Sequence, residues 1–133
     1  MLNVRPLILI LATLLAAGCQ TSTFKDFDLN ALLYPGSNRL KQGIQKYDEG
    51  NYRVATRHLQ SALEEGLRRP DRVEAHKYLA FIACVSSQPQ TCREEFAIAL
   101  ELNPNFQLAP AEAGHPIWGP VFKSVKGKQP KQP

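Results

Sequence analysis

The sequence predicts an all-α protein: two tetratricopeptide-like helical hairpins, which supply about four long helices, followed by a short C-terminal capping helix. Two observations predict it. Between residues 38 and 105 apolar residues return every three or four positions, which is the period of an α-helix that buries one face. The same stretch repeats itself after about 37 residues, and self-similarity at this period is typical of stacked helical hairpins.

The repetition pairs small residues with small ones and large apolar residues with large ones. The matched pairs are Gly43 with Ala80, Ile44 with Phe81, Ala55 with Cys92, Leu59 with Phe96, and Ala62-Leu63 with Ala99-Leu100. In the first unit Gly50-Asn51 separates two apolar periodic stretches, and a glycine can take the left-handed conformation that ends a helix. Each unit is therefore expected to be a pair of helices joined by a turn.

Both units resemble the tetratricopeptide repeat. The resemblance rests on Gly50-Asn51-Tyr52, Ala55, Leu59 and Ala62-Leu63 in the first unit, and on Leu79-Ala80, Phe96, Ala99-Leu100 and Asn103-Pro104 in the second. The second unit departs from the family at its turn, where Ser87-Gln88-Pro89 replaces the Gly-Asn-Tyr run. The resemblance implies that the first helices of successive repeats line a concave, protein-binding face.

Residues 1–19 read as a lipoprotein signal peptide. Arg5 is followed by an apolar run from Leu7 to Ala17, which is too short for a stable transmembrane helix. The run closes on Ala16-Ala17-Gly18-Cys19, which resembles a bacterial lipobox, and implies lipidation of Cys19 and cleavage before it. Because Gln20 rather than Asp follows the cysteine, the sorting pattern favours the outer membrane, with the chain facing the periplasm. An ordinary signal peptide with an incidental cysteine is the alternative.

Residues 20–37 are expected to be a tether and N-terminal cap. The first four are polar, whereas Leu29, Leu32, Leu33 and Tyr34 are too apolar for a plain spacer before Pro35-Gly36 breaks the pattern. We expect residues 29–34 to cover the end of the first hairpin, because two repeats are fewer than a stable stack usually needs. A partner-binding segment is the alternative.

Residues 106–125 are expected to be a C-terminal cap, and residues 126–133 a basic disordered tail. Prolines and glycines predict a turning chain as far as Pro116, followed by a short helix up to Val125 with Trp118 as its anchor. An exposed Trp118 that anchors a partner is the alternative.

The cysteines also fit an exported protein. With Cys19 lipidated, Cys84 and Cys92 remain as an even pair on either side of the second turn, in an oxidising compartment. A disulfide between them is the favoured interpretation, and two buried free thiols are the alternative.

The net charge of the chain is small and does not indicate a nucleic-acid-binding protein. Residues 1–19 hold one of the 16 basic and none of the 12 acidic residues, so the remaining chain carries about +3. Nucleic-acid binding would need a broad basic face and a suitable compartment, and the export signal argues against the second.

A narrower resemblance combines several of these features. The lipobox, the paired cysteines and the stretch Gly114-His115-Pro116-Ile117-Trp118-Gly119-Pro120-Val121-Phe122 resemble small tetratricopeptide lipoproteins of the TssQ type, which are associated with type VI secretion. The resemblance implies an accessory scaffold of an envelope-spanning machine.

Nothing in the sequence predicts an enzyme. His58, His76 and His115 fall on different elements, and none has an acid and a nucleophile at a recognisable spacing. His76 with Cys84 and Cys92 does not match a structural zinc pattern, and no phosphate-binding glycine loop is present in the sequence. We therefore expect no cofactor, no metal and no small-molecule substrate.

Protein binding is the expected class of function. The candidate partner-binding residues are Leu40, Ile44, Tyr47, Lys77, Phe81 and Trp118. For those on the first helices of the repeats, burial under the N-terminal cap is the alternative. A scaffold in a type VI secretion system is the first hypothesis, and a general periplasmic adaptor or chaperone in outer-membrane or cell-wall assembly is the second. In both, the partners are proteins of the cell envelope and the lipid supplies the membrane attachment.

Overall fold

A computed structural model describes residues 29–130, and within this range the regular secondary structure consists of seven helices and no strand. The helices are α2 (Leu29–Leu33), α3 (Gly36–Asp48), α4 (Tyr52–Glu65), α5 (Arg69–Val85), α6 (Pro89–Leu102), α7 (Pro110–Ala113) and α8 (Trp118–Gly127). The predicted all-α class is confirmed for this part of the chain. Cys19 lies outside the described residues. None of the helices between residues 29 and 130 combines the length and the apolar character that crossing a bilayer requires.

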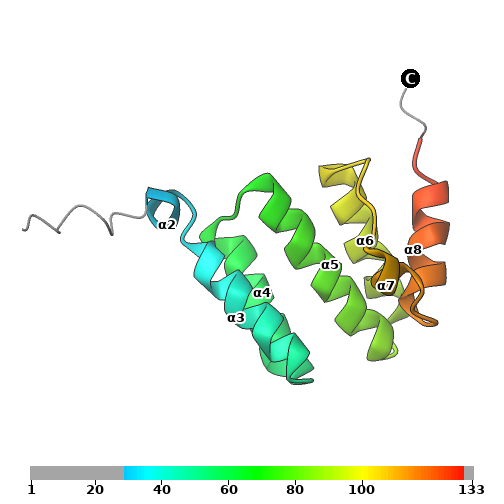
Figure 1. Cartoon of the computed structure of the whole chain (residues 1–133), viewed down its shortest axis with the longest axis horizontal. Helices are drawn as coiled ribbons and strands as arrows, with labels where there is room; N and C mark the ends of the chain where they lie inside the picture. The colour runs from blue at the N-terminus through cyan, green and yellow to red at the C-terminus, as the bar shows by residue number, and fades with distance from the viewer. Residues whose placement is uncertain (1–28, 131–133) are drawn as a thin grey trace, which may run out of the picture.

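The long helices form two hairpins that stack side by side (Figure 1). α3 packs along α4, and α5 packs along α6. α5 also contacts both α4 and α3, and α8 contacts α6 and α5 in the same way. α8 therefore takes the next place in the stack, and α2 lies at the opposite end (Figure 1).

The core repeats with the same 37-residue period as the sequence. Ala55 and Leu59 in α4 are fully buried, and so are their counterparts Cys92 and Phe96 in α6. The small residue Gly43 lets α3 approach α4 closely, since a Cβ atom there would lie 2.8 Å from the side chain of Leu59. Both hairpins are thus held by the same kind of close helix contact.

The two hairpin turns also correspond. Gly50 has a φ of +74°, and the residue 37 positions later, Ser87, has a φ of +58°. Both are left-handed, and this conformation is strained for a residue with a Cβ atom. In the first turn the Asn51 side chain accepts a hydrogen bond from the Val54 N–H at 3.4 Å. The second turn instead carries a disulfide between Cys84 and Cys92, whose Cα atoms are 5.0 Å apart, as the cysteine pairing predicts.

The bounds and packing of the two terminal segments differ from those expected from the sequence. The leucines of α2 are largely exposed rather than packed on the first hairpin, and α3 already begins at Gly36, inside the expected tether. At the other end α8 runs two residues beyond Val125, and the Lys126 Nζ donates a hydrogen bond to the Phe106 carbonyl at 2.5 Å. Lys126 therefore belongs to the C-terminal cap and not to the tail.

Candidate protein-binding groove

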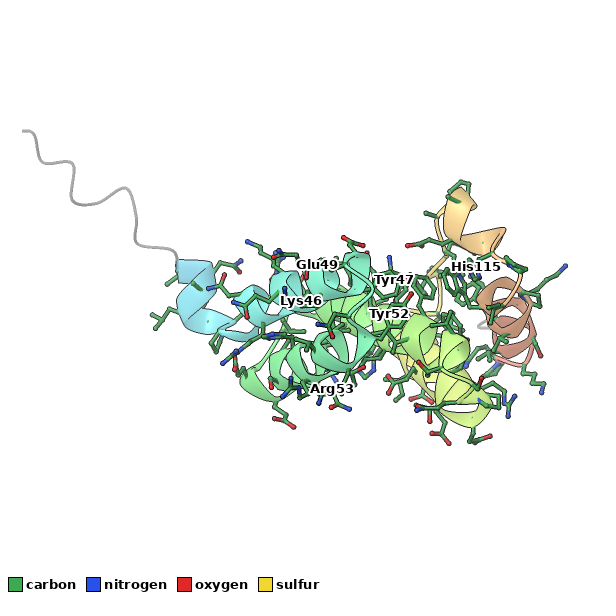
Figure 2. All side chains as sticks on the ribbon, turned by 90° about the horizontal axis from the view of Figure 1, so that it is seen from below. Lys46, Tyr47, Glu49, Tyr52, Arg53 and His115 are labelled. Carbon is green, nitrogen blue, oxygen red and sulfur yellow. A yellow bond between two sulfur atoms is a disulfide. The ribbon has the colours of Figure 1, made fainter. Side chains whose placement is uncertain are left out.

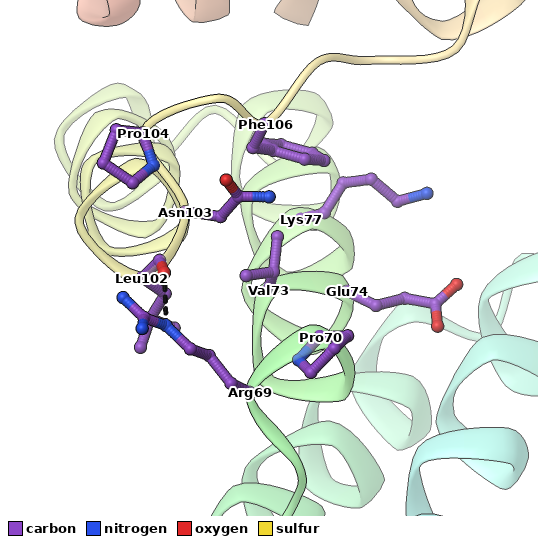
Figure 3. A pocket seen from close by; sticks show the side chains of 9 residues that line it. All are labelled: Arg69, Pro70, Val73, Glu74, Lys77, Leu102, Asn103, Pro104 and Phe106. Atoms are coloured by element: carbon purple, nitrogen blue, oxygen red, sulfur yellow. Dashed lines mark hydrogen bonds between the residues drawn. The ribbon is translucent and has the colours of Figure 1, made fainter.

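An open groove of about 630 Å³ runs along α5, between this helix and the segment that follows α6 (Figure 3). We call it the α5 groove. Its lining residues are Arg69, Pro70, Val73, Glu74, Lys77, Leu102, Asn103, Pro104 and Phe106.

Local sequence fixes the lower end of the groove. Pro70 occupies the first turn of α5, where its missing N–H leaves no hydrogen bond unmade. Asp71 in the same turn accepts a hydrogen bond from the Arg68 Nε at 2.8 Å. The Arg69 Nε donates to the Leu102 carbonyl at 2.6 Å, drawn as the dashed line in Figure 3. This bond joins the start of α5 to the end of α6, so the two walls are held together.

The groove has an apolar floor and charged edges. Val73 is buried, and Phe106 is half-buried on the facing wall (Figure 3). Glu74 points from α5 toward α3 (Figure 3), where it also lines a smaller hollow of about 230 Å³ that contains Ile44. The two hollows therefore share an edge, and together they extend across the faces of α3 and α5.

The upper end of the groove is closed by the segment that precedes α8. The Lys77 Nζ forms an ion pair with the Glu112 Oε1 at 2.7 Å, and both side chains are mostly buried. The other Glu112 oxygen accepts the Ala109 N–H at 2.9 Å. Glu112 thus ties α7 to α5 and ends the open part of the groove at Lys77.

Behind this closure lies an aromatic stack. The Trp118 ring lies on the Phe81 ring with centroids 4.3 Å apart, and the Trp118 Nε1 donates to the Glu112 carbonyl at 2.9 Å. His115, which Figure 2 shows between α7 and α8, also stacks on the Trp118 ring. Trp118 is only 8% exposed, so it anchors the C-terminal cap and offers no surface to a partner.

Two tyrosines continue the aromatic cluster between the hairpins. The rings of Tyr47 and Tyr78 meet edge to face, with centroids 4.9 Å apart, and Tyr52 packs beside Tyr47 (Figure 2). Burial raises the pKa of Tyr47 and of Tyr78 to about 12, and it is reinforced at both by neighbouring acidic side chains and at Tyr47 also by neighbouring tyrosines. Both hydroxyls are neutral at physiological pH.

The structure divides the six predicted partner-binding residues. Leu40, Phe81 and Trp118 are buried in the core, whereas Ile44, Tyr47 and Lys77 keep partly exposed side chains. Of these, Lys77 lines the α5 groove and Ile44 lines the hollow next to it. Sequence reasoning missed the opposite wall at Asn103 and Phe106, because no periodicity marks a loop that folds back on a helix.

A second cavity, of about 770 Å³, lies between residues 107–116 and α8. Leu108 and Phe122 are buried apolar side chains in its lining, and Lys123 and Lys126 are its lysines. It belongs to the cap, whereas the α5 groove lies on the helices of the stack itself.

The residues considered for metal chemistry are engaged elsewhere. The His76 Nδ1 lies 2.6 Å from the Glu95 Oε2, which connects α5 to α6, and the two cysteines are bridged. Among residues 29–130 no three histidine, cysteine or acidic side chains lie close enough together to hold a metal ion.

Comparisons with known proteins identify no relative of this chain. No protein family, curated protein or solved structure matches the chain.

Proposed function

We propose that this protein is an outer-membrane lipoprotein, anchored through Cys19 and facing the periplasm, whose tetratricopeptide-like repeats act as a scaffold or accessory component of a type VI secretion system. Binding, and not catalysis, is the proposed activity. The partner is a protein of the cell envelope.

The internal repetition carries this proposal. Positions 37 residues apart match in the sequence and in the left-handed turn, and the pairs Ala55 with Cys92 and Leu59 with Phe96 also match in burial. α8 stands where the first helix of a third repeat would stand. Stacked helical hairpins of this kind present extended surfaces for protein partners. The lipobox and the paired cysteines support the compartment, and the resemblance to TssQ-type lipoproteins supports the assignment to a secretion machine.

The α5 groove is the proposed contact surface. Val73 on its floor and Phe106 on its facing wall suit the apolar side chains of a peptide or helix. The charges at Arg69 and Glu74 would fix the orientation of that bound segment. The groove is short, because Glu112 closes it at Lys77, so we expect one contact among several and a modest affinity.

A pulldown of the full-length protein from solubilised membranes tests the proposal. We expect the wild type to recover envelope components of the type VI machine, and Glu74→Lys to lose them because the charge in the groove is reversed. Glu101→Lys, on the exposed face of α6, is the matched control and should retain them. Recovery of outer-membrane or cell-wall assembly proteins instead would favour the general adaptor, and equal recovery by both variants would remove the groove from the binding surface.

A further inference from the structure

Helix α2 exposes an unpartnered apolar face. Leu29, Leu32 and Leu33 are 55%, 66% and 61% exposed, and they account for three of the five large apolar side chains that are exposed between residues 29 and 130. Their spacing of three and four residues places them on one side of the helix. The helix has no charged residue. The leucines therefore form a small continuous stripe and are not scattered over the surface.

We propose that this stripe docks on the bilayer surface. The inference rests on the proposed function, because it takes Cys19 as the lipid anchor. Nine residues separate Cys19 from Leu29, and even a fully extended chain of that length spans only about 34 Å. Lipidation would thus hold α2 close to the headgroups at a high effective concentration, so that a short apolar stripe is sufficient for docking.

The chemistry of the stripe favours lipid over a protein partner. Energetically dominant residues at protein interfaces are mainly Trp, Tyr and Arg, and leucine is under-represented among them. The large apolar side chains that α2 exposes are all leucines, and acyl chains can surround them because they need no hydrogen-bond partner.

Docking through α2 would also orient the stack. α2 lies at one end and α8 at the other (Figure 1), so the first hairpin would face the membrane and α8 would point into the periplasm. Only Tyr34 and Pro35 separate α2 from α3, and the N–H of Gly36, the first residue of α3, donates to the Gly66 carbonyl at 3.1 Å. The hairpin would therefore stand directly on the docked helix.

A single fluorophore tests the contact. In the lipidated, disulfide-bonded protein, Leu32→Cys provides a free thiol, because Cys19 carries lipid and Cys84 is bonded to Cys92. The full-length variant is labelled with nitrobenzoxadiazole and reconstituted into vesicles of phosphatidylethanolamine and phosphatidylglycerol. We expect blue-shifted emission that aqueous iodide quenches poorly. Ser124→Cys on α8, exposed at the far end of the stack, should give water-like emission and full quenching.

A second variant excludes partitioning by the fluorophore itself. With Leu29→Ser and Leu33→Ser added, the label at position 32 should become accessible to iodide, while the protein stays on the vesicles and keeps its thermal midpoint. Docking is overturned if the label at position 32 is as accessible as that at position 124. It is also overturned if the blue shift of the emission appears only after envelope proteins are added to the vesicles, because the stripe then binds a protein partner. A blue shift that grows with the density of the protein on the vesicles overturns it too, because the stripe then binds a second copy. The intact mass of the same sample reports lipidation separately. A lipidated protein whose α2 does not dock contradicts this inference alone, whereas an unmodified Cys19 contradicts both the proposed lipid anchor and the inference.

Discussion

Trp118 is predicted to be the most important single side chain of the C-terminal cap. It is 8% exposed, stacks on Phe81 and donates a hydrogen bond to the Glu112 carbonyl. Truncating a buried aromatic residue to alanine costs about 3–5 kcal/mol, because apolar contact is lost and a cavity remains. We expect Trp118→Ala to lower the free energy of unfolding by about 4 kcal/mol, a large part of the 5–15 kcal/mol typical of a domain.

The neighbouring residue supplies a matched control. Ile117 is 49% exposed, so Ile117→Ala should cost no more than about 0.5–1 kcal/mol. Trp118→Phe keeps a ring against Phe81 but leaves the Glu112 carbonyl without its donor, and an intermediate cost of about 1–2 kcal/mol is expected.

Urea unfolding followed by far-ultraviolet circular dichroism measures these differences. With a denaturant slope of roughly 1.5 kcal/mol/M, the Trp118→Ala midpoint should fall by about 2.7 M. The reasoning fails if Trp118→Ala and Ile117→Ala shift the midpoint equally, because the stack would then contribute no stability that depends on burial.

Three further predictions follow from the turns and the aromatic cluster. Ser87→Gly should raise the free energy of unfolding by about 1 kcal/mol by relieving the left-handed backbone, whereas Gly50→Ala should lower it by about 1–2 kcal/mol; thermal unfolding of both variants decides this. Reducing the disulfide to two thiols should cost about 2.5 kcal/mol, as expected for a nine-residue loop, and urea midpoints of the reduced protein that match those of the oxidised protein would contradict this estimate. Stability should fall as pH rises from about 10 to about 12, because unfolding releases Tyr47 and Tyr78 to ionise at their ordinary pKa while the folded protein keeps both protonated; the slope of unfolding free energy against pH should flatten in Tyr78→Phe.

The repeat stack could be predicted because its signals are local and periodic. The spacing of Leu59 and Ala62, and of Phe96 and Ala99, shows which helix faces are buried, and the structure buries all four. The cysteine pair was predictable for the same reason, since the turn that separates the two residues brings them together. The equivalence of Ser87 and Gly50 was hidden, because backbone conformation and not residue type is shared there.

The candidate site depends on contacts that a one-dimensional pattern does not encode. Lys77 and Glu112 are 35 residues apart, and their ion pair decides where the groove ends. The sequence left open whether Trp118 is buried or exposed, because a tryptophan suits a core as well as an interface. Its stacking on Phe81 shows that it belongs to the core. The leucines of α2 have an apolar pattern that predicts burial, yet they remain exposed. The long helices, their period and the paired cysteines could thus be predicted from local pattern, because they depend on neighbours within one or two turns. Whether the apolar residues of the two terminal segments are covered could be seen only in the folded chain, because this depends on how those segments fold back on the stack.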